Sequence, residues 1–316
     1  MWLKKLSTFY YRALGFLRRK IRDFKRRPAR KYEADLVKRN WYDLSARSEL
    51  PLVLIGGCGR SGTTLLREML NRHPKLFCGP ETSMFGLPFW PNNISKMWNL
   101  DEQRLISDAQ AADNLVHFAE QFYVEQSARA GKERAADKTP NNIRVIGKLL
   151  TWFPNSRFIH IVRDGRDVAC SLRNHPKEKI ENGEIVPSLI NRPIGECAQR
   201  WLDDTSSGLV YRSHPRYHEI KYEDLVSEPQ AVLGELCQFI GEDYQPCMLD
   251  PGASQSDNMN AGRLVNNQNS KAKVSSRSLG RWRNDLTADE KKDFEDIAGE
   301  LLITLGYVDS NRWLKE

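Results

Sequence analysis

A chain of 316 residues is long enough for one large α/β domain with a substantial core, and no break in composition divides it after residue 45. The formal charge of the chain is +7, and its positive part is concentrated in residues 1–40, which hold 14 Lys and Arg but only 3 Asp and Glu. The remaining residues hold 34 Lys and Arg and 38 Asp and Glu. We therefore expect a basic segment over 1–45 and a mildly acidic domain over 46–316. No recognition motif accompanies the charge, so we expect no nucleic-acid partner.

The basic segment mixes aromatic and aliphatic residues with Lys and Arg, and no uncharged run in it reaches the ~20 residues that a membrane-spanning helix needs. It also has no clean secretory signal. Two interpretations stay open: a helix on an anionic membrane surface, or a solvated or homodimer-forming helix. Six scattered cysteines without metal-ligand spacing indicate a reducing compartment. The prediction is a cytoplasmic protein that can be peripheral at the membrane surface.

The first predicted element of the domain is a strand over 52–55 that is buried on both faces, followed by a glycine-rich loop and a helix. Such a loop points backbone N–H groups and the positive end of a helix dipole at an anion. Gly57 and Gly62 have Walker A spacing, but Thr63 stands where the lysine belongs and the cation is Arg60. This loop suits a 5′-phosphate bearing another group better than an Mg²⁺-bound triphosphate.

Downstream, strands alternate with helices, which predicts an α/β fold: a parallel sheet with helices on both faces and ligands beyond the carboxyl ends of its strands. Two polar stretches without periodicity, 175–193 and 250–273, are expected to be long loops. The other predicted strands are 75–79, 157–162 and 217–221, and the predicted helices are 101–130, 141–153, 164–173, 194–212, 229–240 and 288–305.

Two motifs carry a family resemblance. The loop Gly56-Gly-Cys-Gly-Arg-Ser-Gly-Thr-Thr-Leu-Leu66 resembles the 5′-phosphosulfate loop of sulfotransferases that use 3′-phosphoadenosine-5′-phosphosulfate (PAPS), and residues 158–172 resemble their 3′-phosphate motif. The resemblance spans residues 50–307, is closest to the tyrosylprotein sulfotransferase branch and its bacterial relatives, and implies a P-loop-type sheet. Three shorter motifs add to it: His73-Pro74, Cys78-Gly-Pro-Glu-Thr82 and Asp137-Lys-Thr-Pro140.

The resemblance implies where PAPS binds. Arg163 and Ser171 would hold the 3′-phosphate that distinguishes PAPS from an ordinary adenylate, although an ion pair with Asp164 or Asp167 is the alternative for Arg163. Arg166 is expected to face solvent. The phosphosulfate would contact Gly59, Arg60, Ser61, Gly62, Thr63 and Thr64.

Two further cofactor contacts follow from the same resemblance. Tyr222 would line the adenine pocket, or else be a core tyrosine. The segment 275–282 would cover the nucleotide and supply Arg277, together with Ser275 or Ser276, to the 3′-phosphate.

The catalytic residues are also inferred by resemblance. Arg60 and Lys138 would stabilise the charge on the bridging oxygen, with hydroxyl groups of the loop assisting. Glu81 occupies the place of the glutamate base in Cys-Gly-x-Glu-Thr; an N-cap or salt-bridge role is its alternative. His73, beside a proline at a helix end, is expected to be structural. Pro80 replaces a second acidic residue of that branch, so peptide recognition is not implied.

The acceptor is expected to carry a hydroxyl group, on a glycan, a lipid or a tyrosyl peptide. Because a sulfuryl group carries a single charge, no metal is required. Two rival interpretations stay open: a P-loop kinase acting on a small molecule, and a non-catalytic nucleotide-binding protein.

Overall fold

The structure is a computed structural model that describes residues 35–86, 91–174, 177–181, 184–188, 191–250 and 279–315. The predicted cofactor contacts Ser275, Ser276 and Arg277 therefore lie outside the described residues, as do residues 1–34 of the basic segment and all of the predicted loop 250–273 except Asp250.

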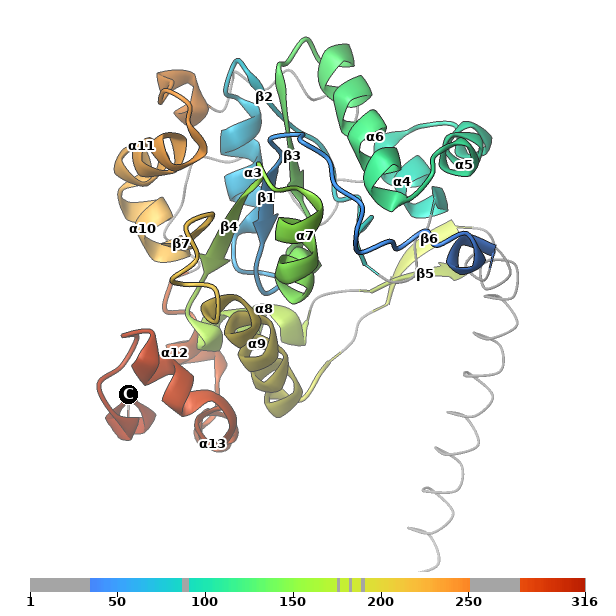
Figure 1. The fold of residues 1–316 in the computed structure, drawn as a ribbon. Helices are drawn as coiled ribbons and strands as arrows, with labels where there is room; N and C mark the ends of the chain where they lie inside the picture. The colour runs from blue at the N-terminus through green and yellow to red at the C-terminus, as the bar shows by residue number, and fades with distance from the viewer. Residues whose placement is uncertain are drawn as a thin grey trace, which may run out of the picture.

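Five parallel strands form the central sheet, in the order β2-β3-β1-β4-β7 (Figure 1). In β1, Leu54 pairs with Asp137 of β3 on one side and with Phe158 of β4 on the other. The predicted parallel α/β sheet is confirmed. The strands are β1 (Val53–Gly56), β2 (Leu76–Cys78), β3 (Arg134–Lys138), β4 (Arg157–Val162) and β7 (Tyr217–Lys221).

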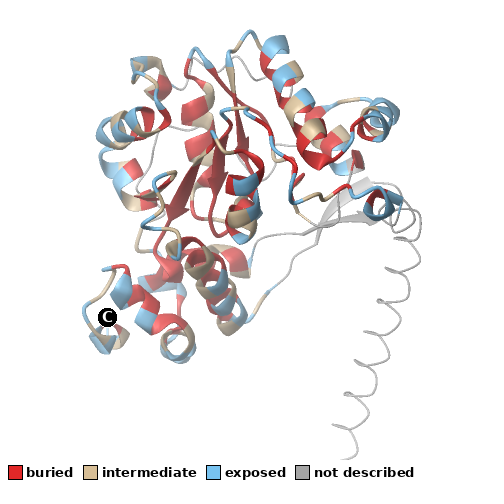
Figure 2. Ribbon diagram, viewed as in Figure 1, coloured by how far each residue is buried: buried red, intermediate tan, exposed pale blue. Residues whose placement is uncertain are grey.

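Helices cover both faces of the sheet. Alternate residues of the first strand face opposite sides: Leu54 packs in the cluster that contains α6 and α7, whereas Val53 and Ile55 pack in the cluster that contains α3, α10 and α11 (Figures 1 and 2). The helices are α3 (Thr63–Asn71), α4 (Pro91–Trp98), α5 (Glu102–Ala111), α6 (Leu115–Arg129), α7 (Ile146–Trp152), α8 (Gly165–Arg173), α9 (Ile194–Leu209), α10 (Tyr222–Ser227), α11 (Pro229–Ile240), α12 (Trp282–Asp285) and α13 (Ala288–Thr304), with 3₁₀ turns η1 (Pro140–Val145), η2 (Pro246–Leu249) and η6 (Asn311–Lys315).

Two of the secondary-structure predictions were wrong, and one strand was not predicted. The helix expected over 101–130 is two helices, because the Asn114 side chain accepts the N–H groups of Val116 and His117 and so begins α6. The stretch 175–193, expected to be a loop, contains the antiparallel strands β5 (Lys177–Glu181) and β6 (Glu184–Ser188). The strand β3 was missed, because charged residues interrupt its apolar pattern.

The described end of the basic segment packs on the domain. Leu36 and Trp41 are buried in the same core cluster as Leu54 and the aromatic residues of α6. A third cluster, around Trp201 and Trp282, joins α8, α9 and α13 at the carboxyl edge of the sheet. In the part of the chain that the structure describes, no helix combines the length and the apolar character that crossing a membrane requires.

Candidate active site

The carboxyl edge of the sheet brings together predicted site residues from all five strands. In spatial order, Glu81 follows β2, Lys138 ends β3, the loop 57–62 follows β1, Arg163 follows β4 and Tyr222 follows β7. Parallel strands end at the same edge, so motifs far apart in sequence become neighbours there.

The glycine-rich loop is shaped by close backbone contacts. Gly62 has φ 94°, and a Cβ on it would lie 2.2 Å from Cδ2 of Tyr222. Arg60 also has a positive φ, 76°, and the N–H of Ser61 donates to the Cys58 carbonyl at 3.1 Å. The loop therefore turns tightly, and its next residue, Thr63, begins α3 with its N–H groups directed at the loop.

The two predicted anion-binding motifs contact each other directly. Arg60 donates from Nε to the Ser171 hydroxyl at 3.0 Å, and Arg163 donates from Nη1 to the Arg60 carbonyl at 3.2 Å. Arg163 lies with its guanidinium 4.4 Å from the ring centroid of Tyr222 and with Nη2 3.7 Å from Asp167 Oδ2. Arg163 thus pairs with Asp167 and also contacts the glycine-rich loop at Arg60.

Burial is the main reason that the pKa of Arg60 is lowered, and the nearby charges of Arg163 and Arg281 lower it further. Arg60 therefore belongs to a cluster of like charges that includes Arg163 and Arg281. Such a cluster is stabilised by an anion, which is the chemistry of a phosphate or phosphosulfate site.

Arg281 was missed in the sequence. Its backbone neighbours are fixed by Asp167, which accepts the N–H of Gly280 at 2.8 Å and that of Trp282 at 3.1 Å. Its guanidinium pairs with Asp285, with Nη2 2.5 Å from Oδ2. The sequence did contain a signal, since Arg281 is the middle residue of the Gly-x-Trp that ends the segment 275–282.

Arg200 of α9 is a second arginine that the motifs did not indicate. One of its guanidinium nitrogens lies 3.2 Å from the position that a Cβ on Gly59 would take. It shares the buried carboxylate of Asp204 with Arg144, which donates to that carboxylate at 2.5 Å.

The prediction that Arg166 faces solvent was wrong. Its side chain is buried, donates from Nε and Nη2 to the Asp164 carboxylate at 3.0 and 2.7 Å, and lies 3.9 Å from the ring centroid of Trp282. Aromatic faces and a bidentate carboxylate together stabilise a buried guanidinium. Arg166 therefore joins α8 to the C-terminal segment.

Beside the loop, Lys138 forms an ion pair with Glu81, its Nζ 2.5 Å from Oε1. The lysine side chain is 4% exposed, whereas that of Glu81 is 38% exposed and so remains accessible from solvent. Below them, the buried Asp137 accepts from the Thr82 hydroxyl at 3.0 Å and from the Asn142 amide at 2.7 Å. These bonds fix the segments of Glu81 and Lys138 relative to each other.

His73 does not lie at this edge of the sheet. It follows the end of α3, a helix that starts at the loop and runs back along the sheet. Its ring is buried, with Nε2 3.0 Å from the Asp243 carbonyl, while Nδ1 accepts the N–H of Lys75 at 3.2 Å. Both ring nitrogens are thus engaged by backbone groups.

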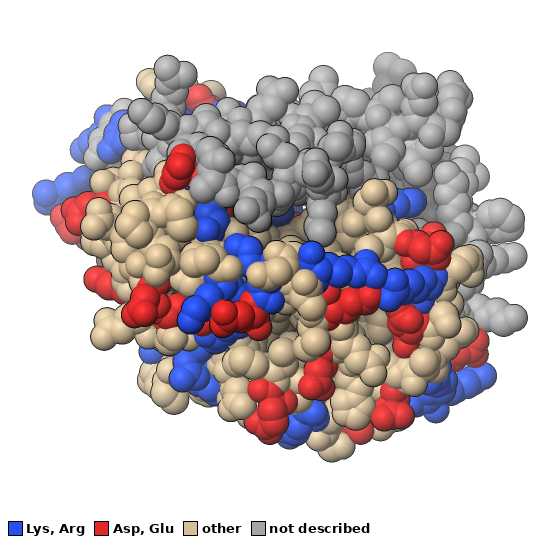
Figure 3. All heavy atoms as spheres, turned by 90° about the horizontal axis from the view of Figure 1, so that it is seen from above, with Lys and Arg blue, Asp and Glu red and all other residues tan. Residues whose placement is uncertain are grey.

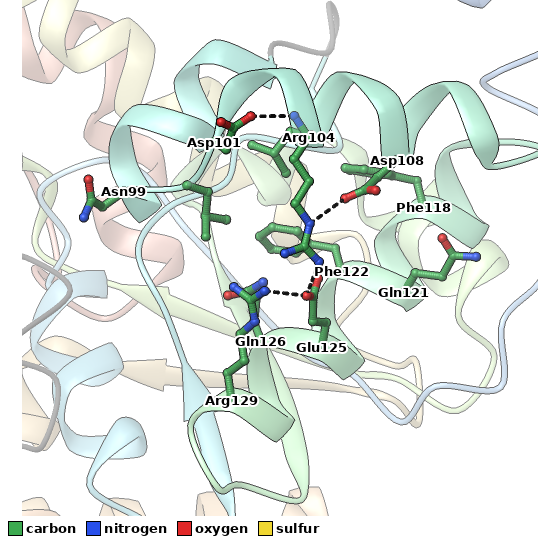
Figure 4. A pocket seen from close by; sticks show the side chains of 12 residues that line it. Asn99, Asp101, Arg104, Asp108, Phe118, Gln121, Phe122, Glu125, Gln126 and Arg129 are labelled. Carbon is green, nitrogen blue, oxygen red and sulfur yellow. Dashed lines mark hydrogen bonds and ion pairs between the residues drawn. The ribbon is translucent and has the colours of Figure 1, made fainter.

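A separate pocket lies between α5 and α6 (Figure 4). Arg104 pairs with Asp108 and Glu125, and Glu125 also accepts from Arg129 at 2.6 Å. Carboxylates balance the cations here, so this pocket is not an anion site. The face seen from above in Figure 3 likewise mixes Lys and Arg with Asp and Glu.

A model described as the sulfotransferase family matches residues 51–246, which is more than half of the chain. The chain belongs to the sulfotransferase family. This sulfotransferase is 26% identical over 286 residues to protein-tyrosine sulfotransferase 2 of Gallus gallus, a match that covers 87% of this chain and 74% of the relative. The resemblance to the tyrosylprotein branch is thereby confirmed, and nothing in these comparisons supports the kinase interpretation.

Solved structures share the fold. The sulfotransferase domain from the Synechococcus PCC 7002 olefin synthase superposes with a TM-score of 0.57 at 22% identity, over 82% of this chain and 96% of that domain. Mouse sulfotransferase SULT7A1, solved in complex with PAP, superposes with a TM-score of 0.51 at 16% identity, over 87% and 92% of the two chains.

Proposed function

We propose that this sulfotransferase transfers the sulfuryl group of PAPS to a hydroxyl group of a glycan, a lipid or a tyrosyl peptide. The observation that carries the proposal is that two predicted anion-binding motifs, linked by hydrogen bonds, lie at the same sheet edge as the accessible Glu81–Lys138 ion pair. The two motifs suit the phosphosulfate and the 3′-phosphate of PAPS, and the Glu81–Lys138 pair suits removal of the proton from the acceptor hydroxyl.

The residues present fit PAPS. Arg60, the loop amides and the N-terminus of α3 offer donors for the phosphosulfate, while Arg163 and Ser171 offer donors for a second anion, the 3′-phosphate. Tyr222, packed against Gly62 and the Arg163 guanidinium, provides an aromatic wall for adenine.

When bound, PAPS supplies the activated sulfuryl group. Glu81 takes the proton of the acceptor hydroxyl as the oxygen–sulfur bond forms, and Lys138 holds that carboxylate in place. As the bond from sulfur to the bridging oxygen breaks, Lys138 and Arg60 stabilise the negative charge that develops on that oxygen. The hydroxyls of Thr63 and Thr64 assist at the start of α3. No step needs a divalent cation, so activity should survive a chelator.

The test is a panel of glycans, lipids and tyrosyl peptides incubated with ³⁵S-labelled PAPS, read by label transfer and by mass analysis of the product. Label on one class at a hydroxyl oxygen supports the proposal. Transfer of phosphate from ATP to the same acceptors, abolished by chelator, would contradict it.

The basic segment is the second part of the proposal. Residues 1–40 would contact an anionic membrane surface or a second copy of the chain. Sedimentation of the full chain with phosphatidylserine vesicles, and its sedimentation velocity without them, separates these two arrangements. A chain that sediments as a monomer and does not bind the vesicles would contradict both the membrane contact and the dimer.

A further inference from the structure

Two arginines share one buried carboxylate beside the glycine-rich loop. Asp204 of α9 is 1% exposed, and it accepts from Nε of Arg144 at 2.5 Å and from Nε of Arg200 at 3.5 Å. The side chains of these two arginines are 51% and 41% exposed. The neighbouring carboxylate, Asp203, accepts from the Gln199 amide at 2.8 Å. Two accessible guanidinium groups therefore share a single buried carboxylate.

Arg200 is the arginine of this pair that lies against the loop. Its Nη2 lies 3.2 Å, and its Cζ 3.9 Å, from the position that a Cβ on Gly59 would take. Apart from the residues on either side of Gly59 in the chain, no other described atom comes within 4 Å of that position. Asp204 binds Arg200 through Nε, and no described residue accepts a hydrogen bond from its two terminal nitrogens. Gly59 thus leaves space for a guanidinium whose outer N–H groups stay available.

The sulfuryl group of the proposed donor has a charge that needs such N–H groups. In the proposed function, Arg60 and Lys138 stabilise the bridging oxygen, while Arg163 and Ser171 bind the 3′-phosphate. The sulfuryl oxygens lie one bond beyond the bridge and carry a negative charge of their own. The planar fork of an arginine matches oxyanions of this shape.

We propose that Arg200 binds the sulfuryl group of PAPS and that Asp204 holds its guanidinium against Gly59. The inference rests on the proposed function, because its ligand is the donor of that reaction. It adds to the two anion-binding motifs a donor-binding residue from α9, a helix that belongs to neither. Since the contact is made to the group that is transferred, the desulfated nucleotide does not depend on Arg200.

The experiment compares PAPS with its desulfated product, 3′-phosphoadenosine-5′-phosphate (PAP), by calorimetric titration of the full chain without acceptor. Arg200→Gln should lower PAPS affinity about tenfold, because a charge-assisted contact is lost, and leave PAP affinity within about twofold. Equal losses for the two nucleotides would assign Arg200 to the 5′-phosphate, and no loss for either would remove it from the donor site. Each of these results would overturn the proposal.

The matched control is Arg129→Gln. The Arg129 side chain is also 41% exposed and also pairs with a carboxylate four residues away on its helix, that of Glu125. It lies on α6, in the separate pocket between α5 and α6. This variant should change the affinity for neither nucleotide, and a loss of PAPS affinity equal to that of Arg200→Gln would overturn the proposal.

A second measurement uses the wild-type chain, so it does not depend on the folding of a variant. Phenylglyoxal modifies accessible arginines, and mass analysis of peptides gives the rate at each position. Saturating PAPS should slow modification of Arg200 several-fold more than saturating PAP does, whereas Arg129 should react equally fast with either nucleotide. Equal protection of Arg200 by both would overturn the inference. Failure of the proposed function is distinguishable, since the wild type would then bind PAP and AMP alike.

Discussion

The ion pair between Lys138 and Glu81 gives an asymmetric prediction for stability. The lysine is buried and the glutamate is partly exposed, with 4% and 38% of their side chains accessible. Lys138→Met removes the buried charge and leaves Glu81 to solvent, so the free energy of unfolding should fall by less than about 1 kcal/mol. Glu81→Gln leaves the ammonium buried beside a neutral amide and should cost about 1–3 kcal/mol. Urea denaturation of both variants measures the difference.

Turnover should respond differently from stability. Lys138→Met removes a cation proposed to stabilise the leaving oxygen, so kcat should fall about 10²–10³-fold. Glu81→Gln removes the proposed base and should lower kcat about 10²–10⁴-fold. Both are measured by ³⁵S transfer at saturating PAPS, with PAP affinity as the control for an intact donor site. Turnover within about twofold of wild type in either variant would refute the role of that residue.

Three further predictions follow from single positions. Gly62→Ala should lower the free energy of unfolding by about 1–2 kcal/mol, because the left-handed backbone at this position disfavours a Cβ. It should also weaken PAP binding, because that Cβ would lie 2.2 Å from Tyr222. The control in denaturation and calorimetry is Gly234→Ala, where a Cβ meets nothing within 4 Å. Ser171→Ala should lower PAP affinity about tenfold and leave AMP affinity unchanged, since one hydrogen bond to a charged group is lost; equal losses in calorimetry would contradict this. Burial lowers the pKa of His160 to about 4, so below pH ~6.5 the unfolded state binds a proton that the folded state does not. Stability should therefore fall as pH drops from ~6.5 toward 4, by up to ~1.4 kcal/mol per unit, and His160→Gln should flatten the profile in urea titrations.

Regular apolar patterning made much of the fold predictable. The strands at 157–162 and 217–221 and the helix at 229–240 have the expected bounds, because their burial follows from their own side chains. The glycine-rich loop was also predictable, since few other structures need that spacing of glycines after a buried strand.

The parts that were missed depend on partners far away in the chain. The strand β3 is stable with Asp137 buried in it because Thr82 and Asn142 supply hydrogen bonds that no local pattern reveals. Likewise, Arg166 is buried only because Asp164 and the ring of Trp282 surround it. Sequence patterns describe one segment at a time, and such residues are stabilised by contacts between segments.

The central claim is that two linked anion-binding motifs recognise a nucleotide phosphorylated at both its 3′ and 5′ positions. Calorimetric titration of the wild-type chain with PAP and with AMP tests it most directly. We predict that PAP binds at least tenfold more tightly, because Arg163 and Ser171 gain an anion that AMP does not provide. Equal affinity for the two nucleotides would contradict the claim.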